Sequence, residues 1–399
     1  MYYRCLYRHF LAAFIVVSAV FSSSFSCAQE AADARKSLKQ TQIKGLLVIK
    51  LSNGTFAGAA SQMNATVVTQ QKGFEIGFNQ NVGNMMNKAT VEVEKFIRVR
   101  YSEKLPAGMR IELSFADKYS PKDGPSAAVV CALMCDSIIS GKEIDSGFAA
   151  TGDMTATGEV QPVGGVASKI KGAIRKKCSH VGIPIANKSS ITDAYILKGI
   201  KPLYQIQIFS IKTFTEASAL AMKEKPADVQ KALDEFALIQ EALLRNEKYV
   251  YNSKVKEKLR AIVKLVPNHL SARLLYLHSV KKGPKKLSII GSLTGIDNAG
   301  SKLGGMLTDG SFAKAQGLDA DVLTDLMYEI SRLRPMLDKR TTKYADSYLN
   351  VARFFKRHRD RKQFSGQLHT ELTSLVNAIS IERKRLLNNE EVREELMAE

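Results

Sequence analysis

Between residues 43 and 221, stretches of alternating apolar and polar residues interleave with stretches whose apolar residues recur at helical spacing. A period of two predicts a strand, and a period of about 3.6 residues predicts a helix. The predicted strands are residues 44–50, 65–69 and 109–115, and the predicted helices are residues 82–100, 126–140, 166–177 and 213–222. This mixture of elements indicates an α+β or α/β domain.

After Pro226 the strand signals fade and the apolar residues keep a helical period. Helices are expected at residues 229–246, 253–266 and 270–280, and again from about residue 319 to the C-terminus. Between them, residues 291–317 contain seven glycines and predict a mobile loop. We therefore predict an all-α second domain, residues 222–399. Residues 261–276 resemble the junction of a tetratricopeptide helix pair, but no second copy follows at the period of about 34 residues that an array would have.

The first 28 residues have the pattern of a secretory signal peptide. Two arginines precede a 12-residue apolar run, residues 10–21, and small residues follow up to Ala28. The run is shorter than the roughly 20 apolar residues that a membrane-spanning helix needs. We expect cleavage after Ala28 and export to the periplasm or the medium, with residues 29–42 as a linker. Cys27 leaves a lipoprotein anchor as the minor alternative, because the residues before it lack the usual aliphatic side chain.

The composition limits the classes of partner. Hydrophobic residues make up 45% and charged residues 24%, a balance that excludes a mostly disordered chain. The net charge of +19 suggests a polyanionic partner. Basic clusters lie at residues 175–177, 281–286 and 353–362, although solvated helix faces are the simpler interpretation. For an exported protein an anionic envelope surface is more accessible than DNA, so we expect no nucleic-acid partner and at most a weak envelope contact.

Three cysteines remain after removal of the signal peptide. Cys131 and Cys135 are four residues apart on a predicted helix and therefore share a face. We interpret them as small buried apolar residues rather than as redox or metal-binding groups. A disulfide from Cys178 to one of them remains open in an oxidising compartment.

Ser126 is the first candidate for chemistry. A Gly-Pro pair precedes it and predicts a turn, and the apolar run after it predicts a helix. The main-chain N–H groups and the dipole of a helix N-terminus can stabilise a developing oxyanion. Taken alone, however, a serine after Gly-Pro is more often a helix N-cap than a nucleophile.

A nucleophilic serine needs a base, and histidine is scarce in the mixed domain, where only His180 occurs. A lysine can act as the base if burial lowers its pKa. Lys169 follows a Gly-Gly turn and lies close to the apolar face of a predicted helix. The alternative is an ordinary surface lysine whose stem covers apolar neighbours.

Three stretches around these residues together resemble the proteolytic domain of the Lon family of serine peptidases. They are Pro-Lys-Asp-Gly-Pro-Ser-Ala at residues 121–127, the segment 150–169 that ends in Gly-Gly-Val-Ala-Ser-Lys, and Val-Gly-Ile-Pro-Ile-Ala-Asn at residues 181–187. Ser126 and Lys169 are 43 residues apart, as the Ser-Lys dyad of this family requires. The resemblance covers about residues 43–221 and implies a mixed sheet packed with helices.

The resemblance also implies roles for single residues. Ser126 matches the nucleophile and Lys169 the general base. Thr151 matches a threonine whose hydroxyl holds the lysine ammonium or the serine, and Asp153 and Asp123 match acidic positions that line or gate the site. The chain departs from the family at Ala128, usually glycine, and at residues 167–168, usually a charged pair. Neither change removes a residue that the Ser-Lys chemistry needs. We expect no metal and no cofactor.

These observations predict an exported, ATP-independent serine endopeptidase that cleaves unfolded proteins or peptides through an acyl-enzyme. The sequence contains no Gly-x-x-x-x-Gly-Lys-Ser/Thr loop, so it offers no sign of an ATPase module. The resemblance implies polypeptide substrates and a homo-oligomer, because the family tends to form hexameric rings. The alternative is a catalytically inactive, peptidase-like scaffold that binds partners through its helical domain.

Overall fold

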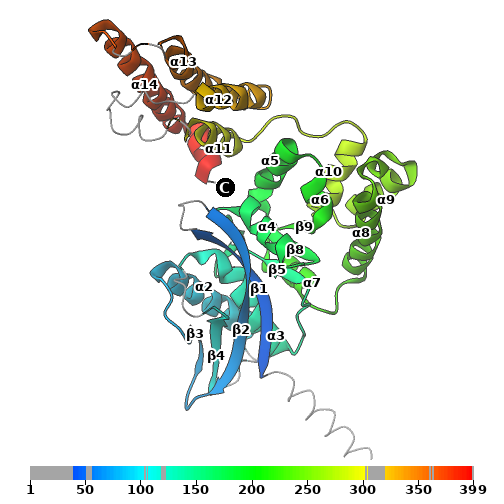
Figure 1. Cartoon of the computed structure of the whole chain (residues 1–399). Coiled ribbons are helices and arrows are strands. Elements are labelled where there is room, and N and C mark those ends of the chain that lie inside the picture. Colours follow the sequence, from blue (N-terminus) through cyan, green and yellow to red (C-terminus); the bar gives the residue numbers. More distant parts are fainter. Residues whose placement is uncertain are drawn as a thin grey trace, which may run out of the picture. The chain divides into compact units, whose positions relative to one another are not determined.

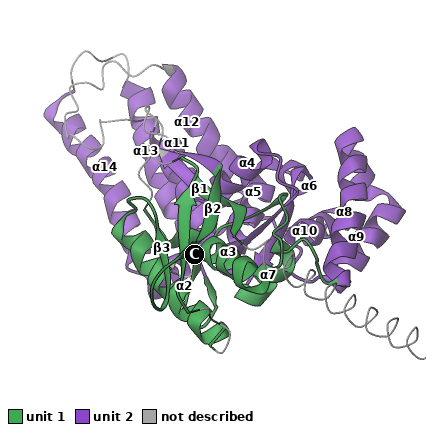
Figure 2. Cartoon of the chain, turned by 90° about the horizontal axis from the view of Figure 1, so that it is seen from below, with its two compact units in different colours: residues 1–47, 60–160, 213–226 green, residues 48–59, 161–212, 227–399 purple. Residues whose placement is uncertain are grey.

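The computed structural model describes residues 39–50, 56–102, 105, 107–117, 123–301, 303, 320–358, 361 and 364–397. These residues fall into two compact units (Figure 2). Unit 1 takes its described residues from segments 1–47, 60–160 and 213–226, and unit 2 from segments 48–59, 161–212 and 227–399. The predicted signal peptide lies outside the described residues. Among the described helices, none is both long and apolar enough to cross a membrane.

Unit 1 is built on a mixed sheet. Its strands are β1 (Gln40–Lys50), β2 (Phe56–Thr69), β3 (Phe74–Phe78), β4 (Met109–Phe115) and β5 (Phe148–Ala150), and neighbours follow the order β3-β4-β2-β1-β5. The last residues of β1 and the first of β2, which fall within segment 48–59, belong to unit 2. Strand β4 runs antiparallel to β2 and parallel to β3, while β1 runs parallel to β5. Alternate residues of β4 (Ile111, Leu113 and Phe115) are buried, as its period-two pattern predicts. The short strands β6 (Asp153–Met154) and β7 (Val160–Gln161) pair separately.

The core of unit 1 is organised by one apolar helix. A short 3₁₀ turn, η1 (Pro125–Ala127), leads into α3 (Ala128–Ser140), in which every residue from Ala128 to Ile138 is buried. A helix that is apolar on all sides belongs in the interior. It packs between α2 (Asn84–Arg100) and α7 (Phe214–Ala221). The core of the unit is therefore the immediate support of the Ser126 segment.

Unit 2 includes a segment of alternating helices and strands. It contains α4 (Val166–Arg175), β8 (His180–Pro184), the turn η2 (Ile185–Asn187), α5 (Lys188–Lys198), α6 (Lys201–Gln205) and β9 (Gln207–Ile211). All five residues of β8 and all five of β9 are buried, and the two strands pair in parallel. Continuous burial of this kind is typical of strands covered on both faces.

Helices then dominate, as the sequence predicts. The helices α8 (Ala227–Arg245), α9 (Ser253–Leu265) and α10 (Leu270–Ser279) lie close to their predicted bounds (Figure 1). The 3₁₀ turn η3 (Glu247–Tyr251), which was not predicted, lies between α8 and α9. His278 of α10 is held between two tyrosines, because the Tyr195 hydroxyl lies 3.0 Å from its Nδ1 and the Tyr251 hydroxyl lies 2.8 Å from its Nε2. These contacts join α10 to α5 and η3. A tetratricopeptide repeat stays a prediction.

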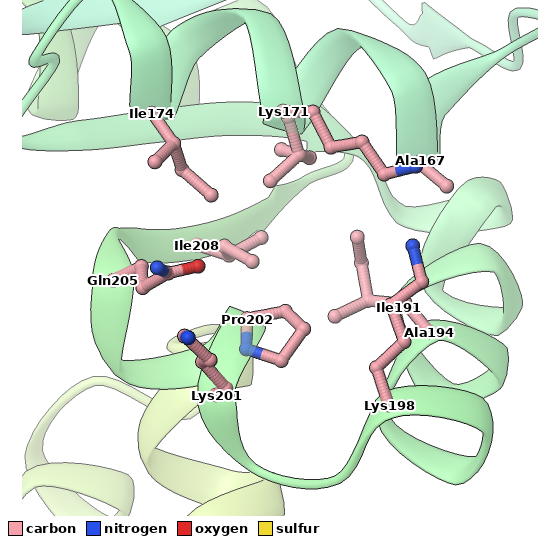
Figure 3. A pocket seen from close by; sticks show the side chains of 11 residues that line it. Ala167, Lys171, Ile174, Ile191, Ala194, Lys198, Lys201, Pro202, Gln205 and Ile208 are labelled. Atoms are coloured by element: carbon pink, nitrogen blue, oxygen red, sulfur yellow. The ribbon is translucent and has the colours of Figure 1, made fainter.

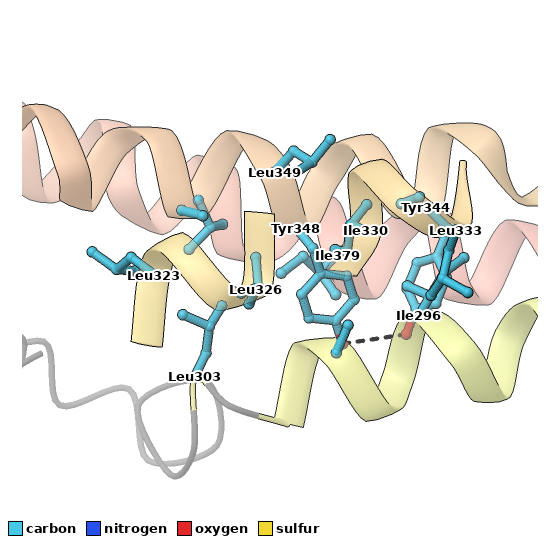
Figure 4. Packing of buried hydrophobic residues seen from close by; sticks show 14 of the residues in the cluster. Ile296, Leu303, Leu323, Leu326, Ile330, Leu333, Tyr344, Tyr348, Leu349 and Ile379 are labelled. Atoms are coloured by element: carbon cyan, nitrogen blue, oxygen red, sulfur yellow. Dashed lines mark hydrogen bonds between the residues drawn. The ribbon is translucent and has the colours of Figure 1, made fainter. Parts of the chain in front are cut away.

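The last helices share one apolar core (Figure 4). They are α11 (Ile289–Gly300), α12 (Ala320–Leu333), α13 (Thr342–His358) and α14 (Gly366–Leu387), with the turn η6 (Lys339–Thr341) before α13. The short helix α15 (Glu390–Met397) follows and contacts α11 and α14. Buried leucines, isoleucines and the rings of Tyr344 and Tyr348 fill the core. The Tyr344 hydroxyl donates to Asp297 Oδ1 at 2.5 Å, so its one polar atom is satisfied. The α+β class with a following helical region is thus confirmed.

Two sequence predictions need correction here. The glycine-rich segment 291–317 is not a loop over its first part, because residues 289–300 form α11. Ser288 caps this helix through a hydrogen bond from Gly291 N to Ser288 Oγ, and Ile296 and Ala299 are fully buried. A side chain on Gly300 would overlap the Tyr348 ring, so this glycine permits close helix packing rather than flexibility. Residues 304–319 lie outside the described part.

The second correction concerns the predicted linker, residues 29–42. Strand β1 already begins at Gln40, and Thr41 Oγ1 lies 3.2 Å from Ser137 Oγ of α3. The end of this segment is therefore part of the sheet, whereas residues 29–38 lie outside the described residues.

Candidate active site

The Ser126 segment has the tight turn that the sequence predicts. Gly124 has φ 119°, a conformation that residues with a Cβ rarely adopt, and Pro125 opens η1. Ser126 is half-buried at the point where η1 leads into α3. The N–H groups of Ala128 and Val129 are already bonded, to the carbonyls of Pro125 and Gly152.

The backbone of Ser126 is held by hydrogen bonds from the two residues that follow β5. Its carbonyl accepts hydrogen bonds from Thr151 Oγ1 at 3.1 Å and from Gly152 N at 2.9 Å. Thr151 is fully buried. This threonine therefore positions the main chain of the serine, a contact that the sequence analysis did not anticipate. Its expected contact with the lysine ammonium or the serine hydroxyl stays a prediction.

Lys169 lies in unit 2 and is deeply buried. It is on α4 with only 3% of its surface exposed, beside the buried Val166, Ile170 and Ala173. Burial lowers the pKa of the Lys169 ammonium to about 8. The alternative of an ordinary surface lysine is therefore wrong.

Close backbone packing explains this burial. Gly58, near the start of β2, lies directly on α4, and a Cβ there would overlap the carbonyl of Ser168 and the main-chain N of Lys169. Gly172 makes a similar approach to the backbone of Ala59. The guanidinium of Arg175 donates to the Gly58 carbonyl and fixes the same contact. Glycines on both sides thus bring the backbone of α4 against the strand beside Lys169.

The two aspartates have different surroundings. Asp123 is exposed, and its Oδ1 accepts from Met85 N at 3.0 Å, Met86 N at 3.2 Å and Gly124 N at 2.8 Å. It therefore caps α2, whose own N-cap residue is a glycine without a side chain. Asp153 is half-buried and accepts from Met154 N at 2.7 Å. Burial raises the pKa of the Asp153 carboxyl, and the nearby Glu92 raises it further. Whether either one lines or gates a site stays a prediction.

The remaining candidate groups of the mixed domain are packed into the interior. His180 is buried, with Nδ1 2.8 Å from Ser179 Oγ. Cys131, Cys135 and Cys178 are buried, and none of the described cysteines forms a disulfide. Burial raises the pKa of the Cys131 thiol to about 12, so this thiol is inert at neutral pH. Within the described residues, no group of three or more His, Cys, Asp or Glu side chains is arranged to hold a metal ion.

Ser126 belongs to unit 1 and Lys169 to unit 2, so each residue is positioned by its own surroundings. The turn, Thr151 and Gly152 fix the serine, and the contact with Gly58 buries the lysine. The first arrangement places a serine at the start of a buried helix. The second produces a lysine that loses its proton more easily than usual. These are the two properties that the chemistry of a Ser-Lys pair requires.

Comparison with known proteins points to one family. Residues 34–222 match the family model described as the Lon protease (S16) C-terminal proteolytic domain. A Lon protease of Borrelia duttonii is 30% identical over 146 residues, which cover 34% of this chain and 17% of that protein. A Lon protease 2 of Borreliella burgdorferi is 34% identical over 137 residues, covering 33% and 17%. A Lon protease of Leptospira interrogans is 29% identical over 174 residues, covering 43% and 20%. The chain thus spans a fifth or less of the length of these relatives.

Proposed function

We propose that this protein is a serine endopeptidase in which Ser126 is the nucleophile and Lys169 the general base, because residues 34–222 match the proteolytic domain of the Lon family. The observation that carries the proposal is the burial of Lys169, which lowers the pKa of its ammonium to about 8. A lysine with an ordinary pKa of 10.5 is about 0.1% neutral at pH 7.5, whereas one with a pKa of about 8 is roughly a quarter neutral. Only a neutral amine can accept the proton of the serine.

The proposed reaction begins with transfer of the Ser126 hydroxyl proton to the neutral Lys169 amine. The serine oxygen attacks the peptide carbonyl, and the charge moves to the carbonyl oxygen. The N–H groups of Ala128 and Val129 already donate hydrogen bonds to the carbonyls of Pro125 and Gly152. We therefore assign the stabilisation of the oxyanion to the main-chain N–H of Ser126. The Lys169 ammonium then protonates the leaving amine, and water, deprotonated by the same lysine, hydrolyses the acyl-enzyme.

The proposal extends to the compartment and the energy source. The basic start, the apolar run and the small residues before Ala28 support export. The 399 residues contain no phosphate-binding loop of the Gly-x-x-x-x-Gly-Lys-Ser/Thr type, which supports turnover without ATP. We therefore assign unfolded segments, peptides and exposed tails as the substrates. Mass spectrometry of the protein from a cell envelope or medium fraction should give an N-terminus at Gln29, whereas an intact Met1 would contradict cleavage.

Two variants test the catalytic assignment. Ser126→Ala and Lys169→Ala should each abolish cleavage of casein and of an internally quenched peptide, without added ATP. Lys176→Ala is the matched control, because Lys176 ends the same helix as Lys169 but is exposed. Unchanged cleavage by Ser126→Ala would refute the assignment. Covalent labelling of Ser126 by a fluorophosphonate would exclude the inactive scaffold, and light scattering in solution would test the hexameric ring that the family resemblance implies.

A further inference from the structure

A pocket of about 170 Å³ lies within unit 2, enclosed by α4, α5, α6 and β9 (Figure 3). Its floor is apolar: Ile170, Ile191 and Ile208 line it and are buried. An apolar cavity of about 150 Å³ can hold a molecule of the size of benzene. The pocket therefore has room for one compact apolar group.

Three lysines surround this apolar floor. Lys171, Lys198 and Lys201 all line the pocket, and in Figure 3 the nitrogen ends of Lys171 and Lys198 turn toward one another. Among the ion pairs of the described residues, none joins these three lysines to a carboxylate. Partial burial and the neighbouring Lys171 lower the pKa of Lys198 to about 8. Two ammonium groups that face each other repel, and an anion between them would remove the repulsion.

We propose that this pocket binds a small free monocarboxylate, with its carboxylate between Lys171 and Lys198 and an apolar body of about the size of a benzene ring on the isoleucine floor. The charge of the rim selects an anion, and the floor selects a ligand with an apolar body over acetate or inorganic phosphate.

The pocket is separate from the surroundings of Lys169, although both use α4. Ala167, Ile170, Lys171 and Ile174 line the pocket, and their spacing of three and four residues places them on one face of the helix. Lys169 lies outside this set, because its main chain packs against Gly58. A ligand in the pocket would thus contact the helix that carries the proposed base without touching the base itself.

Calorimetric titration of the full chain with 3-phenylpropanoate tests the proposal. We expect saturable binding at low salt, and no binding of the uncharged analogue 3-phenylpropanol or of acetate. The bound carboxylate should raise the pKa of Lys198, so binding at pH 8 should take up as much as about half a proton. Titrations in buffers with different ionisation enthalpies measure this uptake. Equal binding of the acid and the alcohol, or binding without proton uptake, would overturn the proposal.

Substitutions at the rim locate the ligand. The double variant Lys171→Gln/Lys198→Gln should weaken binding of the acid at least about ten-fold, because both charge-assisted hydrogen bonds to the carboxylate are lost. The matched double variant Lys176→Gln/Lys188→Gln removes the same charge from positions outside the pocket, at the C-cap of α4 and at the start of α5, and should leave binding unchanged. Circular dichroism of both variants controls for folding. Equal loss in both variants would indicate non-specific charge attraction and overturn the site.

Titrations with peptides distinguish a small free acid from the C-terminus of a polypeptide as the source of the carboxylate. Peptides that end in phenylalanine, with a free or an amidated C-terminus, are titrated under the same conditions. Weak binding of both, together with tight binding of 3-phenylpropanoate, would support a small free acid. Binding of the free peptide without binding of the small acid would assign the pocket to polypeptide ends and overturn the proposal as stated.

Discussion

Replacement of Lys169 by methionine should stabilise the protein at neutral pH while abolishing the proposed peptidase activity. In the folded chain burial lowers the pKa of Lys169 from 10.5 to about 8, so the unfolded chain binds a proton more tightly at this position. A difference of about 2.5 in pKa corresponds to a cost of about 3 kcal/mol for the charged form at pH 7. Methionine has a similar length and no charge, and it therefore avoids this cost.

The pH dependence separates this effect from better packing. Between pH 8 and pH 10.5 the folded chain has lost the Lys169 proton and the unfolded chain retains it, so the wild type becomes more stable as the pH rises. The advantage of Lys169→Met should therefore shrink from about 3 kcal/mol at pH 7 to about 1 kcal/mol at pH 10. Other groups titrate over this range as well, but they titrate in both proteins and cancel in the comparison.

Urea unfolding of the wild type and of Lys169→Met at pH 7 and pH 10 measures these differences. Lys176→Met is the control, since Lys176 is exposed on the same helix, and it should change the free energy of unfolding by no more than about 0.5 kcal/mol. A less stable Lys169→Met protein at pH 7, or a gain that is equal at both pH values, would refute the argument that burial destabilises the charged lysine.

Further predictions follow from the same contacts. The kcat/KM for a peptide substrate should rise with pH to a plateau with an apparent pKa of about 8, because the proposed base must be neutral; a flat profile from pH 6 to pH 9 would count against Lys169. Thr151→Val removes the hydrogen bond to the Ser126 carbonyl and should lower kcat more than it changes KM, while Thr151→Ser should restore much of the rate. Asp123→Ala removes the cap of α2 and should cost about 1 kcal/mol in unfolding free energy, whereas Asp123→Asn should cost less; equal losses would mean that the charge, not the cap, matters.

Much of the fold follows from local patterns in the sequence. The alternation in residues 109–115 and the helical period in residues 82–100 reappear as β4 and α2, because each element buries one face against its own unit. For the glycines of α11 the local pattern led to a wrong prediction, that of a loop. Gly291 and Gly300 suggest a loop in isolation, yet they lie against Asp193 and Tyr348, which are distant in sequence. A single sequence does not show that a glycine marks the contact point of another element.

In the candidate site, too, some features could be predicted from the sequence and others could not. Ser126 and Lys169 were predicted because motif and spacing are carried by the chain itself. The hydrogen bond of Thr151 was not, since its partner is a main-chain carbonyl that has no side-chain signature. Asp123 caps a helix that begins nearly 40 residues earlier, so the usual local capping signals at residues 83–86 do not reveal it. Contacts to backbone across long sequence separations are the part that the sequence did not predict.

The contact of Gly58 with α4 has a consequence for biosynthesis. The start of β2 is made before residue 60, but its partner helix starts at Val166, so about 100 residues must be synthesised before the two can meet. At about 5–20 residues per second, the nascent strand waits roughly 5–20 s. During this interval the part of the strand that α4 later covers is without that cover. The contact that accompanies the burial of the proposed base is thus one of those that form late in synthesis.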